Sequence, residues 1–464
     1  MQDVRDQETR LKNITQKILN QALDLGATDA EVSLSYGLGQ SAEVRLGELE
    51  TIEHYLDQSC GVTVYINQKR GSASSSDLSD SGIKQMVQAA LNIAKYTQED
   101  PCSGLPDLEY IFNKNNLKNL KNLDLDLYHL PDSSSDCESN FGTTEGLIKR
   151  ALDCEALGLK SNPKITNSDG ASSSYYLGLS ILGHTRGFLE SVASSRYSFD
   201  CTLIAEAEGK MQREGSYSSA RDFKDLWSIE RVAQEASEQV LSRLGARKIP
   251  TQNLPIVFRY DAARSLIGHY LSAISGGALY RQQSFLLDSL GEQLFPEFIT
   301  ITDDPFIPKA LGSAPFDSEG CTVSSKILID HGKIQTYLLS SYAARRLKLK
   351  PTGHAGGAHN IFVSDQKNKD LDLKNLLKQM GTGLLITDLI GQGVNLITGD
   401  YSRGASGFFV EQGEIKFPVE EITIASDLKT MFKNIVAVGD DADDRSSLHC
   451  GSVLIPDMKI AGGG

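Results

Sequence analysis

Apolar residues recur at helical spacing in several stretches of the chain. Residues 8–25 form the first stretch, and Gly26 follows as a helix stop. The clearest stripe has members three and four positions apart: Ile83, Met86, Val87, Ala90, Leu91 and Ala94. The same periodicity predicts helices over about residues 144–157 and 228–244. For the stripe from Ile83 to Ala94, packing on a sheet is favoured over a surface for a partner.

Alternating and β-branched runs predict strands between these helices. Residues 32–36 alternate apolar with polar, and residues 61–66 are rich in β-branched side chains. The serine-rich run at 71–76 fits either a flexible linker or a strand end that leads into the next helix. Between residues 164 and 221, alternating runs separated by turn signals predict an antiparallel sheet with one solvent-exposed face. From residue 251 onward, a strand at 255–258 and many glycine-punctuated runs predict a β-rich domain.

These patterns predict an α+β fold with two main domains. A chain of 464 residues is too long for one ordinary core. We predict an α/β N-terminal domain followed by a β-rich C-terminal domain. The N-terminal domain comprises residues 1–112 and 141–227, joined by a polar connection at 113–140 that includes an Asn/Lys-rich stretch near residue 115. The C-terminal domain is predicted to span residues 228–464, with the boundary close to the helix that begins after Ser228.

The composition narrows the classes of function. The 46 basic and 60 acidic residues give a net charge of −14, which argues against binding nucleic acid. The N-terminus lacks the apolar segment of a signal peptide, and no apolar run is long enough to cross a bilayer. The seven cysteines are scattered without a Cys-x-x-Cys pair, which is typical of reduced thiols. We therefore predict a soluble cytoplasmic protein that binds neither nucleic acid nor membrane.

The residues that could bind a metal or act in catalysis lie in the C-terminal half, and each motif alone is weak evidence for a site. Carboxylates cluster at Asp303-Asp304 and at Asp317 and Glu319, but turns and caps use the same residues more often. His354 and His359 are five residues apart in a glycine-rich loop, which is not a standard zinc spacing. That loop is better interpreted as a place where backbone approaches backbone or a substrate chain.

Several long runs resemble the PmbA/TldE family of TldD/PmbA-type peptidases. The matching runs are YRQQSFLLDSLG at 280–291, PFDSEG at 315–320, PTGHAGG at 351–357, ITGDYSRGA at 397–405, PVEEITIA at 418–425 and GSVLIP at 451–456. Residues 58–102 resemble the N-terminal domain of the family, whereas the stretch near residue 115 has no counterpart. The resemblance implies a two-protein peptidase that degrades or trims small unfolded peptides. Its TldD-type subunit carries a His-Glu-x-x-x-His helix, and a distant cysteine completes the zinc site.

Carried onto this sequence, the motif is incomplete. Arg264 and Ser265 stand where the family has the zinc-binding histidine and the glutamate base, and only His269 matches the end of the motif. Cys450 is the candidate for the distant thiolate, so we expect it to face the same cavity as His269. Arginine is a permanent cation and cannot bind zinc, and serine cannot act as the base. We therefore expect no catalytic residue and no metal in this chain, and zinc only in the TldD-like partner.

Three hypotheses of function follow from these observations. The favoured one is a non-catalytic subunit that forms a heterodimer with a TldD-like chain, or a homodimer alone, around peptide substrates. The second is an autonomous metal-dependent peptidase that uses His269, Cys450 and carboxylates from Asp317 or Glu319. The third is a peptide-binding module. In each case we predict peptide or pocket contacts from four residues: Asp317, Glu319, His354 and Arg403.

Overall fold

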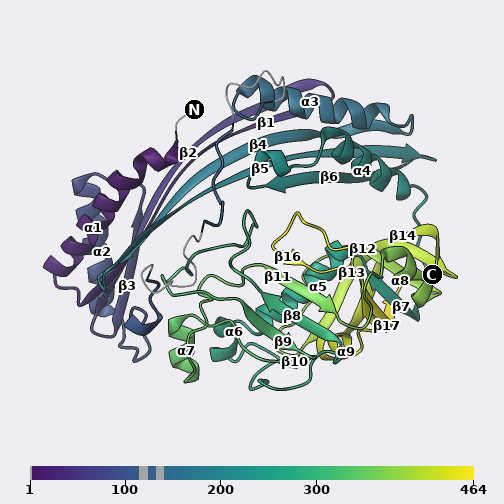
Figure 1. Ribbon diagram of the computed structural model, residues 1–464. Coiled ribbons are helices and arrows are strands. Elements are labelled where there is room, and N and C mark those ends of the chain that lie inside the picture. The colour runs from purple at the N-terminus through teal and green to yellow at the C-terminus, as the bar shows by residue number, and fades with distance from the viewer. Residues whose placement is uncertain (1–2, 114–123, 132–139, 464) are drawn as a thin grey trace.

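The N-terminal half of the chain forms one long antiparallel sheet. The computed structural model describes residues 3–113, 124–131 and 140–463. The strands are β1 (Asp29–Arg45), β2 (Glu48–Ile66), β3 (Lys69–Ser75), β4 (Ile165–His184), β5 (Phe188–Ala207) and β6 (Lys210–Ala220). Their order in the sheet is β3-β2-β1-β4-β5-β6. β1 and β4 pair along most of their length, from Glu31 opposite His184 to Val44 opposite Ala171. The long strands bend into an arch (Figure 1).

Four long helices pack on this sheet. They are α1 (Glu8–Asp24), α2 (Asp80–Tyr96), α3 (Thr144–Lys160) and α4 (Ile229–Ser242). α1 and α2 lie at one end of the arch, and α3 and α4 lie at the other (Figure 1). Ser79, Thr143 and Ser228 cap three of the helices by accepting a hydrogen bond from a backbone N–H three residues later. The apolar stripe of each helix is buried in the core of the N-terminal half, so the predicted helices are confirmed.

The domain boundary differs from the predicted one in a single element. The predicted C-terminal domain starts at residue 228 and so includes α4. In the structure, Val232, Ala236 and Val240 of α4 lie in the core of the N-terminal half. The boundary therefore follows α4. Most of the predicted polar connection, including the Asn/Lys-rich stretch near residue 115, lies outside the described residues. Short 3-10 helices at Val4–Gln7, Leu108–Tyr110 and Phe223–Asp225 complete this half.

The C-terminal half contains two sheets. The first has the order β14-β13-β12-β7-β17-β15 and contains β7 (Gln252–Phe258), β12 (Gly383–Ile390), β13 (Asp400–Glu411), β14 (Glu414–Asp427), β15 (Ala437–Val438) and β17 (Val453–Ala461). Pairing of β14 with β17 closes five of these strands into a barrel. The second sheet has the order β10-β9-β8-β11-β16 and contains β8 (Ile299–Asp303), β9 (Lys326–Asp330), β10 (Lys333–Ile334), β11 (Ile361–Asp365) and β16 (Leu448–His449).

Short helices complete the C-terminal half. They are α5 (Tyr260–Ala273), α6 (Gly276–Tyr280), α7 (Ser341–Leu347), α8 (Leu373–Met380) and α9 (Leu428–Lys433). One large core unites α5 with strands of both sheets. The predicted α+β class and the β-rich C-terminal half are confirmed. Within the described residues, no helix is both long enough and apolar enough to cross a bilayer.

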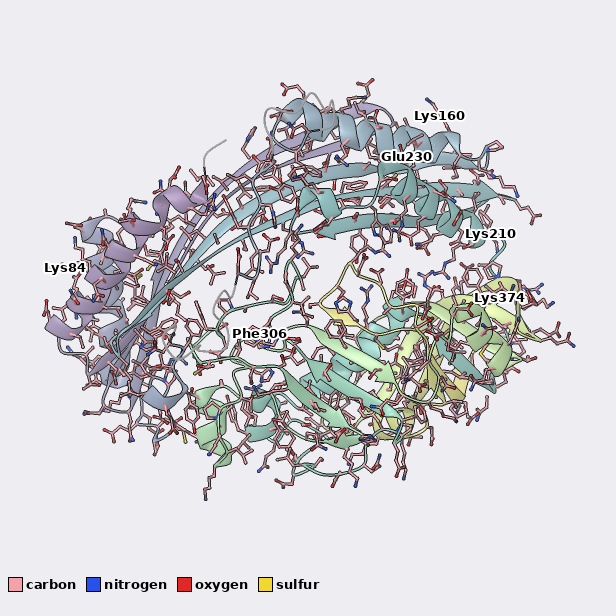
Figure 2. The ribbon with its side chains drawn as sticks, in the orientation of Figure 1. Lys84, Lys160, Lys210, Glu230, Phe306 and Lys374 are labelled. Atoms are coloured by element: carbon pink, nitrogen blue, oxygen red, sulfur yellow. The ribbon has the colours of Figure 1, made fainter. Side chains whose placement is uncertain are left out.

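The C-terminal half lies beneath the concave side of the arch (Figure 1). Figure 2 shows Lys84 on α2 at the outside of the arch and Phe306 on the side of the C-terminal half that faces the arch. Backbone hydrogen bonds join the halves, because Phe112 N–H donates to Gly320 O at 2.8 Å and Thr322 N–H donates to Tyr110 O at 2.8 Å. The two halves therefore share main-chain contacts as well as side-chain contacts.

A buried arginine provides a second kind of link between the halves, through its side chain. Arg445, in the loop before β16, donates from Nε to Asp443 Oδ2 at 2.8 Å within its own loop. Its Nη1 reaches across to Glu235 Oε2 of α4 at 3.0 Å and to Tyr217 O of β6 at 2.9 Å. The guanidinium also lies over the ring of Trp227 at 4.1 Å. Asp443 pairs with this cation within its own half, and Glu235 adds a second carboxylate from the other half.

We expect Arg445→Met to lower the free energy of unfolding by about 3–5 kcal/mol, because the change leaves Asp443 buried without its cation. Urea denaturation followed by circular dichroism measures this loss. Arg213→Met is the matched control, since Arg213 pairs with Asp169 in an exposed position with 63% of its side chain accessible. That change should cost less than about 1 kcal/mol. Equal losses for the two variants would contradict the role assigned to Arg445.

Candidate functional site

Helix α5 directly follows β7 and carries the incomplete metal motif. Its buried face consists of Ala262, Ala263, Leu266, Ile267 and Tyr270, which anchor the helix in the C-terminal core. The periodicity of an α-helix then leaves Arg264, Ser265 and His269 on a half-buried face. The three motif residues are therefore held on a rigid element.

Arg264 lies beside the loop that contains Cys450. Its positive charge acts on Cys450, on His449 and on Asp443. Burial raises the pKa of the Cys450 thiol, and the nearby Asp441 carboxylate raises it further, whereas Arg264 lowers it. The Cys450 thiol donates to Gly451 O at 3.3 Å. Burial thus favours the neutral thiol of Cys450 when no metal is bound.

Ser265 and His269 have different neighbours on the same helix. Ser265 Oγ accepts a hydrogen bond from Arg403 Nη1 at 2.9 Å, and Arg403 Nη2 donates to Leu389 O at 3.2 Å. The His269 ring packs edge-on against Tyr401, with centroids 6.1 Å apart. Burial, together with the charge of Arg403, lowers the pKa of His269, so the imidazole is neutral. In the described part of the chain, His269 Nε2 is buried without a hydrogen-bond partner.

This arrangement does not fit a catalytic zinc ion. Arg264, which the resemblance places at a ligand position, cannot bind zinc and brings a positive charge to the surroundings of Cys450. Ser265 is bound to Arg403 and offers no base. Arg403 supports α5 from β13, and its predicted contact with a peptide or pocket stays a prediction. That His269 and Cys450 share one cavity stays a prediction.

Glu319 lines a cavity of about 670 Å³ between the two halves. The cavity wall combines acidic and basic side chains, including Glu31, Arg70 and Arg346. Glu319 Oε2 accepts from the backbone N–H of Ser341, at the start of α7, at 2.8 Å. Burial raises the pKa of Glu31 to about 7, and the carboxylate of Glu319 adds to the rise. The mixed charges would suit a ligand that carries both signs.

Asp317 accepts hydrogen bonds from three backbone N–H groups. Its Oδ1 accepts from the N–H groups of Glu319 at 3.0 Å and Cys321 at 2.8 Å. Its Oδ2 accepts from the N–H of Ala355 at 3.1 Å. Burial raises the pKa of Asp317 to about 6, although these hydrogen bonds oppose the rise. The interpretation of Asp317 as a turn residue fits these contacts.

His354 and His359 meet at Asp303, a contact that the sequence analysis missed. His354 Nε2 lies 2.8 Å and His359 Nδ1 lies 2.9 Å from the same oxygen, Asp303 Oδ2. The carboxylate and both rings are buried. The pairing of β8 with β11 brings Asp303 to the two histidines, because it sets Asp303 opposite Ile361, two residues after His359. No spacing within the loop could reveal that pairing, because the two strands are distant in sequence.

The comparisons with known proteins agree along the whole chain. Residues 30–94, 143–244 and 251–462 match domain 1, the central domain and the C-terminal domain of the PmbA/TldA metallopeptidases. The chain is 44% identical to Metalloprotease PmbA of Escherichia coli O157:H7 over 454 residues, 97% of either chain. It is 43% identical to a Metalloprotease PmbA homolog of Haemophilus influenzae over 459 residues, which are 99% of this chain and 98% of the homolog. A crystal structure from Bacteroides thetaiotaomicron superposes on this chain with a TM-score of 0.89 at 25% sequence identity. The superposition covers 97% of this chain and 99% of that chain, which is named for a suggested role as a modulator of DNA gyrase.

The double variant Arg264→His, Ser265→Glu should restore zinc binding at α5, because it supplies a ligand and a base and removes the cation beside Cys450. We expect about one additional zinc ion per chain relative to the parent protein, measured by mass spectrometry of the metal after dialysis. Adding Cys450→Ser to the double variant should remove that increment. If the double variant gains no zinc, Cys450 and His269 do not form one site.

Stability should also depend on pH through Glu31. The pKa of its carboxyl rises from 4.5 to about 7 on folding, so the fold favours the neutral form. This carboxyl therefore reduces stability progressively as pH rises between those two values. We expect Glu31→Gln to raise the melting temperature more at pH 8 than at pH 5. Glu48→Gln, at an exposed position of β2, should change little at either pH. The same shift for Glu31→Gln at both values would contradict this account.

Proposed function

Because the chain belongs to the PmbA/TldA metallopeptidase family, we propose that it is the non-catalytic subunit of a two-protein peptidase. The proposal rests on the residues that α5 carries at the positions of the metal motif. Arg264 stands where a zinc ligand is needed, and Ser265 is bound to Arg403 where a base is needed. A TldD-like partner supplies the zinc ion and the complete His-Glu-x-x-x-His helix. This chain supplies a matching scaffold and part of the peptide-binding surface.

The proposed substrates are small unfolded peptides. The cavity between the two halves supports this class, because it is lined by carboxylates and guanidinium groups together: Glu31, Glu319, Arg70 and Arg346. A peptide carries both charges at its termini and in its side chains, so it can pair with each kind of group. The aromatic rings of Tyr65 and Tyr342 in the same wall offer flat surfaces for side chains.

We propose that the working assembly is a heterodimer in the cytoplasm. Two diverged copies of one fold would inherit a two-fold contact, and the isolated chain would then form a homodimer through the same surface. Such a contact is expected to bury more than about 1,000 Å². The six cysteines in the described part of the chain are free thiols, which supports a reducing compartment.

Co-expression with a TldD-like partner tests the proposal. We expect the two chains to purify together and to cleave an unfolded peptide, and we expect this chain alone to be inactive. His269→Ala and Cys450→Ser in this chain should leave cleavage unchanged, because neither residue binds the catalytic zinc. Replacing the motif glutamate of the partner should abolish cleavage.

Two outcomes would contradict the proposal. Cleavage by this chain alone would favour an autonomous peptidase. Full activity of the partner alone, with peptide still bound by this chain, would leave only a peptide-binding module. Analytical ultracentrifugation of the mixture separates the second outcome from a true subunit, because a subunit must sediment with the partner.

A further inference from the structure

Three side chains able to bind a metal converge beneath the glycine-rich loop that follows α7. Asp303, His354 and His359 are 0%, 4% and 7% exposed. One ligand atom from each residue lies within 4.8 Å of the other two. Two imidazoles and one carboxylate form a donor set that binds Zn²⁺, Mn²⁺ and Fe²⁺ in proteins. We propose that these residues form a binding site for a divalent transition-metal ion, separate from the incomplete site on α5.

The distances between the ligand atoms suit an ion with little rearrangement. The two imidazole nitrogens lie 2.8 Å and 2.9 Å from Asp303 Oδ2. Two ligands at about 2.1 Å from one ion, at roughly a right angle, are about 3 Å apart. At the tetrahedral angle typical of zinc the separation is about 3.4 Å, so shifts of up to about half an ångström would make room for the ion. Asp303 is already oriented, because its Oδ1 accepts from the backbone N–H of His359 at 2.9 Å.

The hydrogen atoms of the rings can also adapt to an ion. A neutral imidazole that binds a metal through one nitrogen carries its hydrogen on the other nitrogen. For His354 the second nitrogen, Nδ1, lies 2.8 Å from Thr352 Oγ1. The Thr352 hydroxyl can itself donate to Tyr337 O at 3.1 Å, which leaves Oγ1 able to accept from His354. Such an outer partner orients the ring and is typical of metal-binding histidines.

The loop around the cluster is fixed and has an approach from solvent. Asn360, next to His359, is fully buried and donates from Nδ2 to Asp304 O at 2.7 Å and to Ser313 Oγ at 2.8 Å. His354 and Gly356 line a cavity of about 460 Å³ at the end of α5. The cavity therefore brings solvent to the loop that carries His354, whose ring itself is fully buried, while Asn360 holds the residue next to His359 in place.

A lysine on the neighbouring strand opposes the ion. Lys326 of β9 lies opposite Asp303 in the sheet, and its charge acts on both Asp303 and His354. Its Nζ donates to Ser324 Oγ at 2.6 Å. Removing this charge leaves the three ligands intact and should strengthen the binding of a cation. Lys326→Met is therefore a variant that tests the site without altering it.

The test is a titration of the full-length chain, stripped with a chelator, with Co²⁺ followed by visible absorbance. We expect binding of about one ion per chain and displacement by Zn²⁺. His354→Ala and His359→Ala should each weaken binding by at least about 10-fold to 100-fold, because each removes a ligand. His331→Ala is the matched control, since His331 Nδ1 lies 2.8 Å from Asp330 Oδ1 in an exposed pair without a second histidine. That variant should bind as the parent does.

Thermal melting of each variant shows whether it has folded. If the two histidine variants do not fold, Lys326→Met still decides, because tighter Co²⁺ binding supports the site and unchanged binding contradicts it. Absence of Co²⁺ binding by the parent chain would leave only a hydrogen-bonded structural cluster and would overturn the proposal. Loss of binding in His269→Ala or Cys450→Ser would assign the ion to α5 and would also overturn it. The proposed subunit function is judged separately, by peptide cleavage.

Discussion

The burial of the Arg445 guanidinium between the two halves is the constraint on which the rest of the structure depends. A buried charge is stable only when acceptors surround it, and these acceptors come from its own loop, from α4 and from β6. The loop cannot move without breaking these bonds. Because His449 and Cys450 follow Arg445 closely in the chain, the same bonds fix the surroundings of Arg264. Arg445 therefore ties the loop beside α5 to the arch, in addition to the backbone hydrogen bonds between the halves.

On α5, two arginines contact or act on the residues that the family resemblance assigns to a metal site. Arg264 places a positive charge near Cys450. Arg403 donates a hydrogen bond to Ser265. Two arginines thus stabilise a polar helix face inside the C-terminal half, and burial favours the neutral thiol of Cys450 when no metal is bound. Of the described residues on this face, His269 keeps a buried Nε2 without a hydrogen-bond partner.

Much of the fold could be predicted from the sequence, but the long strands and the cluster around Asp303 could not. The stripe from Ile83 to Ala94 identifies α2, because a helix that covers a sheet must be apolar on one face. The predicted strand at 32–36 is only part of β1, since its later residues include the buried polar side chains of Gln40 and Ser41. Gln40 donates to Thr144 Oγ1 of α3 at 2.6 Å, a contact that no local pattern reveals. Asp303 and His359 likewise meet only through strand pairing.

The order of elements in the arch has a consequence for its origin. α1, β1, β2, β3 and α2 form a helix–three-strand–helix unit, and α3, β4, β5, β6 and α4 repeat that order. The sheet order β3-β2-β1-β4-β5-β6 reads the same from either edge, with the antiparallel β1–β4 pair at its centre. This is the arrangement that duplication and fusion of one ancestral gene segment would produce. On that view, the β1–β4 pair descends from the contact between two separate copies, now made permanent within a single chain.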